Sequence, residues 1–312
     1  MKVFFDLDPA VYMSGFAAQK SHYNLIWEDS DGETRFTSCE DGAAKKKKLV
    51  AEIAEGGGEV LESEKVVTSE PESFALQCAK TLLTAAESTL RRKFKSKVEV
   101  EYYLTGESNY RDDIATIVPY KGNREDMVKP AHYAAVRQYF IDKWGAEIVD
   151  GIEADDEVSI RSWELWRNKS RPDYVVASID KDLDQIPGMH YDYGKHVFYE
   201  VDELEAEMFF YAQTLAGDST DNIKGCYRLG LGKSSKMVDE WFREFESKAS
   251  ILQSFESWVW PKIVDTYKAN RERYPEQNAN ASHLTAEEQA LENARLVYML
   301  REEDELWTPS FF

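Results

Sequence analysis

The alternation of apolar and polar residues along the chain predicts the strands of an α/β protein. Val3-Phe-Phe5 and the apolar run 174–179 are typical of buried strands, and residues 98–104 predict another. Residues 22–36 alternate in polarity around Asp29-Ser-Asp-Gly32, which indicates a hairpin turn. Because acidic residues follow two of the buried strands, this pattern also places polar chemistry at strand ends.

Helical periodicity fills most of the remaining chain. It predicts helices over residues 43–54, 74–94, 131–144, 202–216 and 284–301. Pro130 suits a first helical position, and Thr285 suits a cap. From Lys233 onward the chain is expected to be nearly all helical, with breaks near Pro261, Pro275 and Ala281-Ser282. Together these elements predict a mostly parallel central sheet flanked by helices, followed by a helical region.

Composition narrows the class of protein. The 312 residues are 43% hydrophobic, enough for a large core and a second, smaller domain, and no apolar run is long enough to span a membrane. Asp6 interrupts the apolar N-terminus, so no export signal is expected, and the three separated cysteines fit reduced thiols in a cytoplasm. The net charge of −20 argues against a general nucleic-acid binder, although residues 222–238 contain four basic residues and no acidic one.

Three tight groups of carboxylates are the most informative feature. They are Glu153-Ala-Asp155-Asp156, Asp180-Lys-Asp182 and Asp218-Ser-Thr-Asp221, and each lies where an apolar stretch ends. Ligands of open α/β sheets bind at the carboxyl ends of strands, and clustered carboxylates select Mg²⁺ or Mn²⁺. A single pair would favour solvated acidic turns, but three pairs at element boundaries favour a metal site.

A glycine-rich basic segment follows the third acidic group. Gly225, Gly230 and Gly232 would let backbone amides approach a phosphate, and Lys233 would lie at a helix start. Contacts of this kind hold a nucleic-acid backbone without reading bases. An ordinary helix end followed by a turn is the alternative, which the adjacent acidic pair makes less favourable.

Cations and aromatic residues also gather upstream of the acidic groups. Arg111, Lys121 and Arg124 could hold a scissile phosphate and neutralise developing charge, and Tyr120 could stack on an unpaired base. An ordinary charged surface loop remains the alternative. The basic run Lys45–Lys48 could similarly bind nucleic acid, but a solvated helix face is favoured.

These motifs together resemble the 5′-nuclease superfamily, which includes phage 5′→3′ exonucleases, flap endonucleases and the 5′-nuclease domain of bacterial DNA polymerase I. Asp6, Tyr-Lys-Gly-Asn-Arg, Glu-Ala-Asp-Asp, Asp-Lys-Asp-Leu-Asp and Gly-Asp-Ser-Thr-Asp-Asn occur in the family's order, over residues 1 to about 240. The resemblance implies an α/β nuclease core over residues 1–205 with a short helical arch at about 119–147. It also implies a helical DNA-binding region over 206–312, with a helix–three-turn–helix motif at about 209–246.

The resemblance further implies roles for individual residues. One metal cluster would comprise Asp6, Glu153, Asp155 and Asp156, and a second Asp180, Asp182, Asp218 and Asp221. Arg111, Lys121 and Arg124 would bind phosphate. DNA would be bound by Tyr120, Lys224, Gly225, Gly230, Gly232, Lys233 and Lys236, with K⁺ an additional ligand of the glycine-rich element in relatives.

The expected function is structure-specific hydrolysis of DNA near 5′ ends with two Mg²⁺ or Mn²⁺ ions. Its expected setting is phage DNA replication, primer removal or recombination, by a monomer in the host cytoplasm that acts on duplex ends, nicks, flaps or RNA–DNA hybrids. A catalytically weak, structure-specific DNA-binding protein is the alternative, which the presence of all eight acids disfavours. A Ca²⁺-binding or purely structural acidic protein would not explain the basic glycine-rich segment.

The chain departs from the family pattern in two places. Glu107 stands one position away from a usual aspartate, and residues 20–73 have no counterpart in the shared motifs. The interval between Arg124 and Glu153 is also short, as in the compact arch of small phage exonucleases.

Overall fold

The structure is a computed structural model that describes residues 1–40, 42–95, 97–168, 173–248 and 254–309. The chain divides into two compact units, one formed by residues 1–9, 86–127 and 144–312 and the other by residues 10–85 and 128–143.

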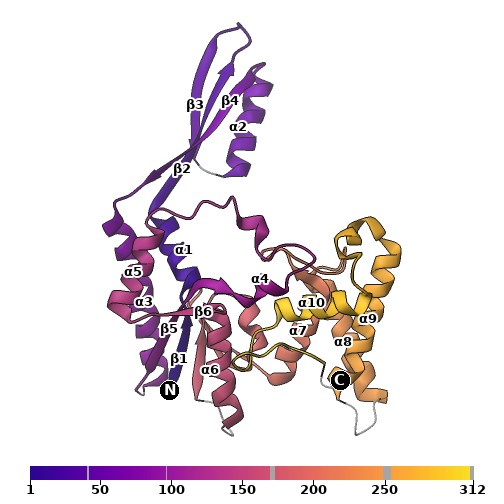
Figure 1. Ribbon diagram of the computed structural model, residues 1–312. Coiled ribbons are helices and arrows are strands. Elements are labelled where there is room, and N and C mark those ends of the chain that lie inside the picture. The colour runs from indigo at the N-terminus through magenta and orange to yellow at the C-terminus, as the bar shows by residue number, and fades with distance from the viewer. Residues whose placement is uncertain (41, 96, 169–172, 249–253, 310–312) are drawn as a thin grey trace. The chain divides into compact units, whose positions relative to one another are not determined.

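The first unit is built on a six-stranded sheet with the order β6-β5-β1-β7-β8-β9. Strands β6, β5 and β1 of this sheet are labelled in Figure 1. All neighbouring pairs are parallel except β8 and β9, so the predicted mostly parallel sheet is confirmed. The strands are β1 (Lys2–Asp6), β5 (Glu99–Asn109), β6 (Glu147–Gly151), β7 (Tyr174–Ala177), β8 (Gly188–Asp192) and β9 (Val197–Val201).

The central strands are almost continuously apolar because both faces of the sheet are covered. Every residue of β7 is buried, and so are Val3, Phe4 and Phe5 of β1. Helix α6 (Ala154–Asn168) packs against β1, β5 and β7, and the C-terminal part of α3 (Glu72–Phe94), from Ala86 onward, belongs to the same unit. This packing fixes the direction of β1, and therefore the position of the acid at its end.

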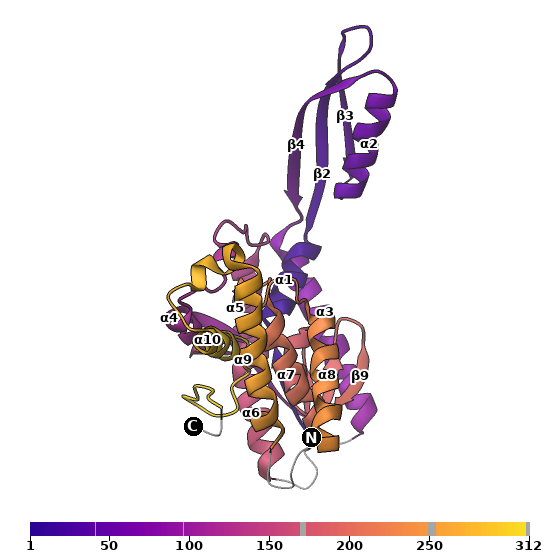
Figure 2. The ribbon, with the colours of Figure 1, turned by 90° about the vertical axis from the view of Figure 1, so that its right-hand side faces the viewer.

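The C-terminal part of this unit is helical (Figure 2), as predicted. Its α-helices pack on one another around a core that contains Phe210, Trp260 and Tyr267. Two short strands, β10 (Gly217–Asp218) and β11 (Ile223–Lys224), pair antiparallel in the loop between residues 216 and 231. The remaining elements of the unit are α4 (Tyr110–Ile114), η1 (Gly122–Arg124), η2 (Lys181–Gln185), α7 (Glu203–Ala216), α8 (Leu231–Lys248), α9 (Phe255–Arg273), η3 (Pro275–Ala281) and α10 (Ala286–Val297).

Two expectations about helix ends were wrong. Pro261 does not break the chain but lies inside α9, where the buried residues Val259, Trp260, Ile263 and Tyr267 anchor the helix on both sides of it. Thr285 caps α10 as predicted, with a reciprocal bond from Glu288, but the helix ends at residue 297 rather than 301.

The second unit contains a three-stranded antiparallel sheet with the order β3-β2-β4 and helix α2 beside it. The predicted hairpin is confirmed as β2 (Gln19–Glu28) and β3 (Thr34–Glu40), and α2 (Ala43–Glu55) follows the predicted range. Strand β4 (Glu59–Ser69) was not predicted. Helix α1 (Asp8–Ala17) lies almost entirely in this unit, as does α5 (Tyr133–Trp144), which starts after Pro130 rather than at it.

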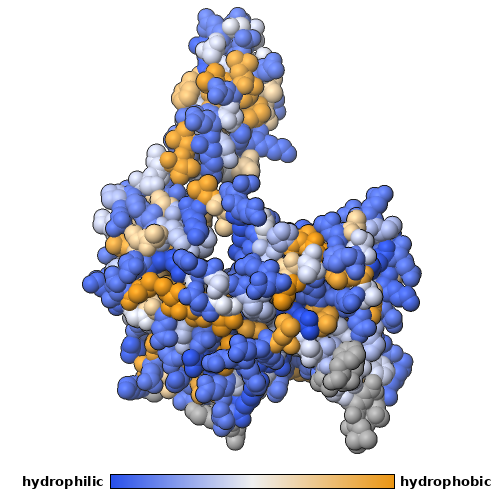
Figure 3. All heavy atoms as spheres, viewed as in Figure 1, coloured by the Kyte–Doolittle hydropathy of each residue, from blue (hydrophilic) through white to orange (hydrophobic). Residues whose placement is uncertain are grey.

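Much of this small sheet is exposed. Phe36 and Leu61 are 66% and 57% exposed, and Figure 3 shows apolar atoms among polar ones over β2–β4. Among the described residues, no helix is long and apolar enough to cross a membrane.

Candidate functional site

Asp6 lies at the carboxyl end of the central strand β1. Strand β5 pairs with one edge of β1, and β7, which follows later in the chain, pairs with the opposite edge of β1. Such a reversal of strand order creates a ligand crevice in open α/β sheets. Asp6 is 4% exposed, and its carboxylate accepts hydrogen bonds from the Asp8 amide (3.1 Å) and the Ser178 hydroxyl (3.1 Å).

Burial raises the pKa of Asp6 well above its ordinary value, and the nearby charges of Asp8 and Asp180 raise it further. Asp8 therefore belongs to the same group of acids, although the sequence interpretation omitted it. Its signal was present in the sequence, because Asp6-Leu-Asp8 follows a strand in the same way as Asp180-Lys-Asp182. Glu107, by contrast, is exposed, and its amide donates to Asp150 (2.9 Å).

The first predicted acidic group forms the start of α6, directly after β6. Burial raises the pKa of Asp155 well above its ordinary value, and Glu153 and Asp156 add to this effect. Burial alone would raise the pKa of Glu153 as well, but Lys121 and Arg111 lower it below its ordinary value. Among the described contacts of this group, Glu153 and Asp156 form ion pairs with basic side chains, whereas Asp155 forms none.

The structure places Arg111 and Asp156 in a buried ion pair. Both side chains are about 1% exposed or less. Arg111 binds Asp156 through two nitrogens and also donates to the carbonyls of Leu296 (2.9 Å) and Tyr298 (2.7 Å). Asp156 additionally accepts from the amides of Glu153 and Leu300, both at 3.2 Å.

These contacts change two roles expected from the sequence. Arg111 is enclosed, with its donors directed at protein acceptors, so it does not face a phosphate. Asp156 accepts hydrogen bonds at both oxygens and is neutralised by the guanidinium, so it does not resemble a metal ligand. We therefore assign the Arg111–Asp156 pair a structural role, in which it holds the start of α6 and its acidic group in place.

The two remaining acidic groups approach each other. Asp182 lies in η2 and accepts from Gln213 of α7 (2.6 Å). Burial, followed by the charges of Asp180 and Asp218, raises the pKa of Asp182 to about 8. Asp218 accepts from the amide of Thr220 (2.6 Å) and thereby shapes the loop that carries Asp221.

The segment 119–124, which we call the basic loop, docks on the segment 217–222, which we call the acidic loop. The Lys121 amide donates to the Asp221 carbonyl (2.9 Å), and Asn222 donates to the Pro119 carbonyl (2.9 Å). Arg124 forms an ion pair with Asp221 and donates to the Thr220 carbonyl (3.0 Å). The local sequences alone could not predict this pairing.

Lys121 connects two acidic groups. Its ammonium forms an ion pair with Glu153 and lies 3.7 Å from Asp221. The lysine side chain remains 29% exposed. It can therefore reach a ligand at this edge of the sheet, as the sequence interpretation expects.

Tyr120 is 8% exposed, and its hydroxyl lies 2.6 Å from Glu153 and 2.8 Å from Asp221. A buried ring with its hydroxyl between two carboxylates is not placed to stack on a base. We therefore interpret Tyr120 as a residue that positions Glu153 relative to Asp221.

We expect Tyr120→Phe to lower the free energy of unfolding by about 1.5–3 kcal/mol, because hydrogen bonds to charged groups contribute that much. Duplex affinity should remain unchanged. Chemical denaturation and a binding titration measure the two quantities. Unchanged stability together with unchanged affinity would contradict the positioning role, and a loss of affinity would restore a DNA-contacting one.

The glycines of the basic segment serve two different purposes. A Cβ on Gly225 would lie 2.1 Å from the Ala216 carbonyl carbon, so Gly225 permits close packing of β11 against the end of α7. At Gly230 and Gly232 a Cβ would meet nothing within 4 Å. Only these two glycines leave the backbone open to a ligand. Lys224, Lys233 and Lys236 are exposed near them.

The histidines take no part in the acidic site within the described structure. His190, which the sequence interpretation considered closest to such a role, is 2% exposed and binds the Ile186 carbonyl (2.7 Å). Burial lowers its pKa.

The donor chemistry of the acids fits hard divalent cations, but the side chains do not converge as they stand. Among the described residues, no three His, Cys, Asp or Glu side chains are arranged to hold a metal ion. Within the same residues, Asp6, Asp155 and Asp182 form no ion pair, and all three have raised pKa values. Their charges would be compensated by a bound divalent cation.

Comparisons with solved structures give matches of low sequence identity. The chain is similar to a structure of T5 5′-exonuclease with bound divalent metal ions (zinc), with 14% identity and a TM-score of 0.40, over 70% of this chain and 91% of that one. It is likewise similar to a structure of the bacteriophage T5 flap endonuclease in a complex with DNA and metal ions, with 14% identity and a TM-score of 0.40, over 70% and 90% of the two chains. No protein-family model matches the sequence, and no curated protein gives a significant match.

Proposed function

We propose that this protein is a divalent-metal-dependent 5′→3′ exonuclease and flap endonuclease that hydrolyses DNA phosphodiester bonds near 5′ ends. The observation that carries the proposal is a set of carboxylates from separate segments gathered at one sheet edge, three of which have raised pKa values and no ion pair among the described residues. The basic loop forms ion pairs with two other members of the set, Glu153 and Asp221. Carboxylates without a counterion, next to basic side chains that can exchange a carboxylate partner for a phosphate, suit a reaction on a phosphate.

Two Mg²⁺ or Mn²⁺ ions would be held by residues of this set, namely Asp6, Asp8, Glu153, Asp155, Asp180, Asp182, Asp218 and Asp221. Bound there, such ions would lower the pKa of a water molecule and stabilise the leaving oxygen. Asp156 is left out because Arg111 already neutralises it.

The protein's own cations act on the phosphate. Lys121 is held by Glu153 and Asp221 and is partly exposed, so it can transfer its hydrogen bonds from a carboxylate to a phosphate oxygen. Arg124 is 32% exposed at the other side of Asp221 and can do the same with a two-pronged donor. Tyr120 keeps Glu153 and Asp221 in place while these bonds change.

We propose that Gly230 and Gly232, through their open backbone, and Lys224, Lys233 and Lys236 bind duplex DNA beside this site. The same glycine-rich element would also bind K⁺. We propose a monomer acting in phage DNA replication, primer removal or recombination in the host cytoplasm. Nicks, flaps and RNA–DNA hybrids are the substrates to compare.

Cleavage is expected to require Mg²⁺ or Mn²⁺ and to stop in excess chelator. The test follows 5′-labelled duplex, nicked and flap substrates with and without Mg²⁺, and Asp180→Asn serves as the inactive control. Full cleavage in chelator would refute the metal-dependent mechanism. Tight binding without any cleavage in Mg²⁺ or Mn²⁺ would instead favour a structure-specific DNA-binding protein.

A further inference from the structure

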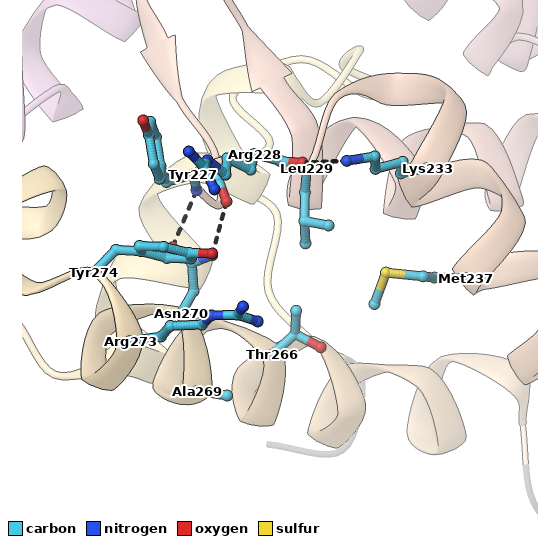
Figure 4. A pocket seen from close by; sticks show the side chains of 10 residues that line it. All are labelled: Tyr227, Arg228, Leu229, Lys233, Met237, Thr266, Ala269, Asn270, Arg273 and Tyr274. Atoms are coloured by element: carbon cyan, nitrogen blue, oxygen red, sulfur yellow. Dashed lines mark hydrogen bonds between the residues drawn. The ribbon is translucent and has the colours of Figure 1, made fainter.

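A pocket of about 460 Å³ lies between the loop after β11, the start of α8 and the C-terminal half of α9 (Figure 4). Tyr227, Arg228 and Lys233 line one side of the pocket. Arg273 and Tyr274, at the C-terminal end of α9, line the opposite side. The proposed DNA-binding segment supplies only the first group, so α9 adds a surface to which no role has been assigned.

The walls of this pocket are held together by specific contacts. Asn270 is 9% exposed; its side chain accepts from the Tyr227 amide and donates to the Tyr227 carbonyl, both at 3.0 Å. The rings of Tyr227 and Tyr274 meet edge to face at 5.1 Å. Arg228 has a φ of 67°, which is uncommon outside glycine and must be maintained by its surroundings. The loop is therefore fixed to α9 rather than loosely placed beside it.

The pocket concentrates positive charge on an acidic protein. None of the described residues that line it is acidic, whereas Arg228, Lys233 and Arg273 are all basic. Within the described chain these three form no ion pair. The Arg228 guanidinium carbon lies 5.5 Å from the Tyr227 ring centre and 5.9 Å from that of Tyr274, and the Arg273 carbon lies 5.3 Å from the latter. The side chain of Arg228 also interacts with the Tyr227 and Tyr274 hydroxyls, but neither arginine has a carboxylate partner among the described residues, so the positive charge of each can still be paired with an anion.

We infer that this pocket binds a phosphodiester group of the DNA backbone through Arg228 and Arg273. The inference rests on the proposed function, and it extends the DNA-binding surface from the glycine-rich segment onto α9. Arginine side chains bind phosphate through two parallel bonds, and backbone recognition of this kind is independent of base sequence.

The position of this phosphate along the DNA is bounded by the chain itself. Tyr227 follows Asp221 by six residues, which can span at most about 20 Å. With the reach of an arginine side chain added, this distance stays below about 34 Å, so the bound phosphate would lie within about one turn of duplex DNA of the acidic site.

The test is charge reversal at Arg273, compared with charge reversal at Lys268. Lys268 is an exposed cation of the same helix that does not line the pocket. Affinity for a fluorescent duplex is measured by anisotropy in chelator at several salt concentrations. We expect Arg273→Glu to weaken binding at least tenfold and to reduce the salt dependence by about one phosphate contact, and Lys268→Glu to weaken it less than threefold. Equal effects of the two substitutions would overturn the inference.

Two further arms complete the experiment. Arg273→Gln, which removes the charge without reversing it, should show a smaller loss of the same kind, and its unfolding curve should match the wild type. Titration with dAMP should not displace the duplex below millimolar concentration, whereas displacement at micromolar concentration would indicate a free-nucleotide site and overturn the backbone assignment. If the wild type failed to cleave in Mg²⁺ but the difference between Arg273→Glu and Lys268→Glu persisted, the nuclease proposal would fail and the pocket inference would stand.

Discussion

Replacing Asp155 by asparagine is expected to lower the rate of DNA cleavage by at least about a hundredfold while leaving duplex affinity close to that of the wild type. A metal-bound carboxylate supports several kcal/mol of charge stabilisation in the transition state, and asparagine is a much weaker ligand. The asparagine oxygen can still accept the bond from the Asp156 amide (2.7 Å), so the start of α6 should remain intact. Single-turnover cleavage and a binding titration measure the two effects.

The same substitution should stabilise the metal-free protein. The pKa of Asp155 is raised in the fold, chiefly by burial and then by Glu153 and Asp156, so its ionised form destabilises the folded state at neutral pH. Asparagine removes that cost, and the midpoint of thermal unfolding in chelator should rise. A lower midpoint together with wild-type cleavage would remove Asp155 from the metal site.

The stability of the wild type in chelator should also depend on pH, because ionisation of a second buried carboxylate destabilises the folded state. Asp182 titrates near 3.8 when unfolded and at about 8 when folded, so the unfolded state releases this proton first. The stability contributed by the protonated form is therefore present at low pH and is lost as the pH rises toward 8. Asp182→Asn should flatten this part of the profile.

Replacing Arg111 by methionine is expected to lower the free energy of unfolding by about 3–5 kcal/mol, because removal of one partner leaves the buried Asp156 carboxylate without its counterion. The carbonyls of Leu296 and Tyr298 lose their donors as well. Chemical denaturation of the two proteins in chelator measures the difference.

Arg124→Met is the matched control for this substitution. Arg124 also forms an ion pair, with Asp221, but its side chain is 32% exposed. Exposed pairs contribute about 1 kcal/mol or less, so a small stability change is expected with a slower cleavage step. If Arg111→Met kept full stability and lost only activity, Arg111 would be a phosphate-binding residue after all.

Most elements could be predicted from the sequence because their burial is periodic. Strand β7 is apolar throughout, β1 is apolar from Val3 to Phe5, and α3 repeats its buried residues at helical spacing. Strand β4 escaped prediction because its residues are mostly exposed and charged, so it forms through backbone pairing with β2 rather than through burial. The break predicted at Pro261 does not occur, because the burial of residues on either side outweighs the free-energy cost of a proline inside a helix.

The placement of Asp6, Asp155 and Asp180 could be predicted from the sequence, because acids that follow parallel strands of one sheet lie at the same edge of it. Their partners could not be. Asp156 lies 45 residues from Arg111 and 144 from Leu300, and no local pattern encodes which cation or amide a buried carboxylate meets.

The sequence by itself therefore determined the fold class and the chemical nature of the site, since hydrophobic periodicity and charge spacing are local properties. The tertiary structure alone decided which residue serves which purpose. It directs Arg111 inward to Asp156 and ends α10 at the carbonyls that Arg111 binds, and it leaves Lys121 partly exposed between Glu153 and Asp221. The physical reason is that burial and pairing of a charge depend on packing between distant segments, and this packing exists only once the chain has folded.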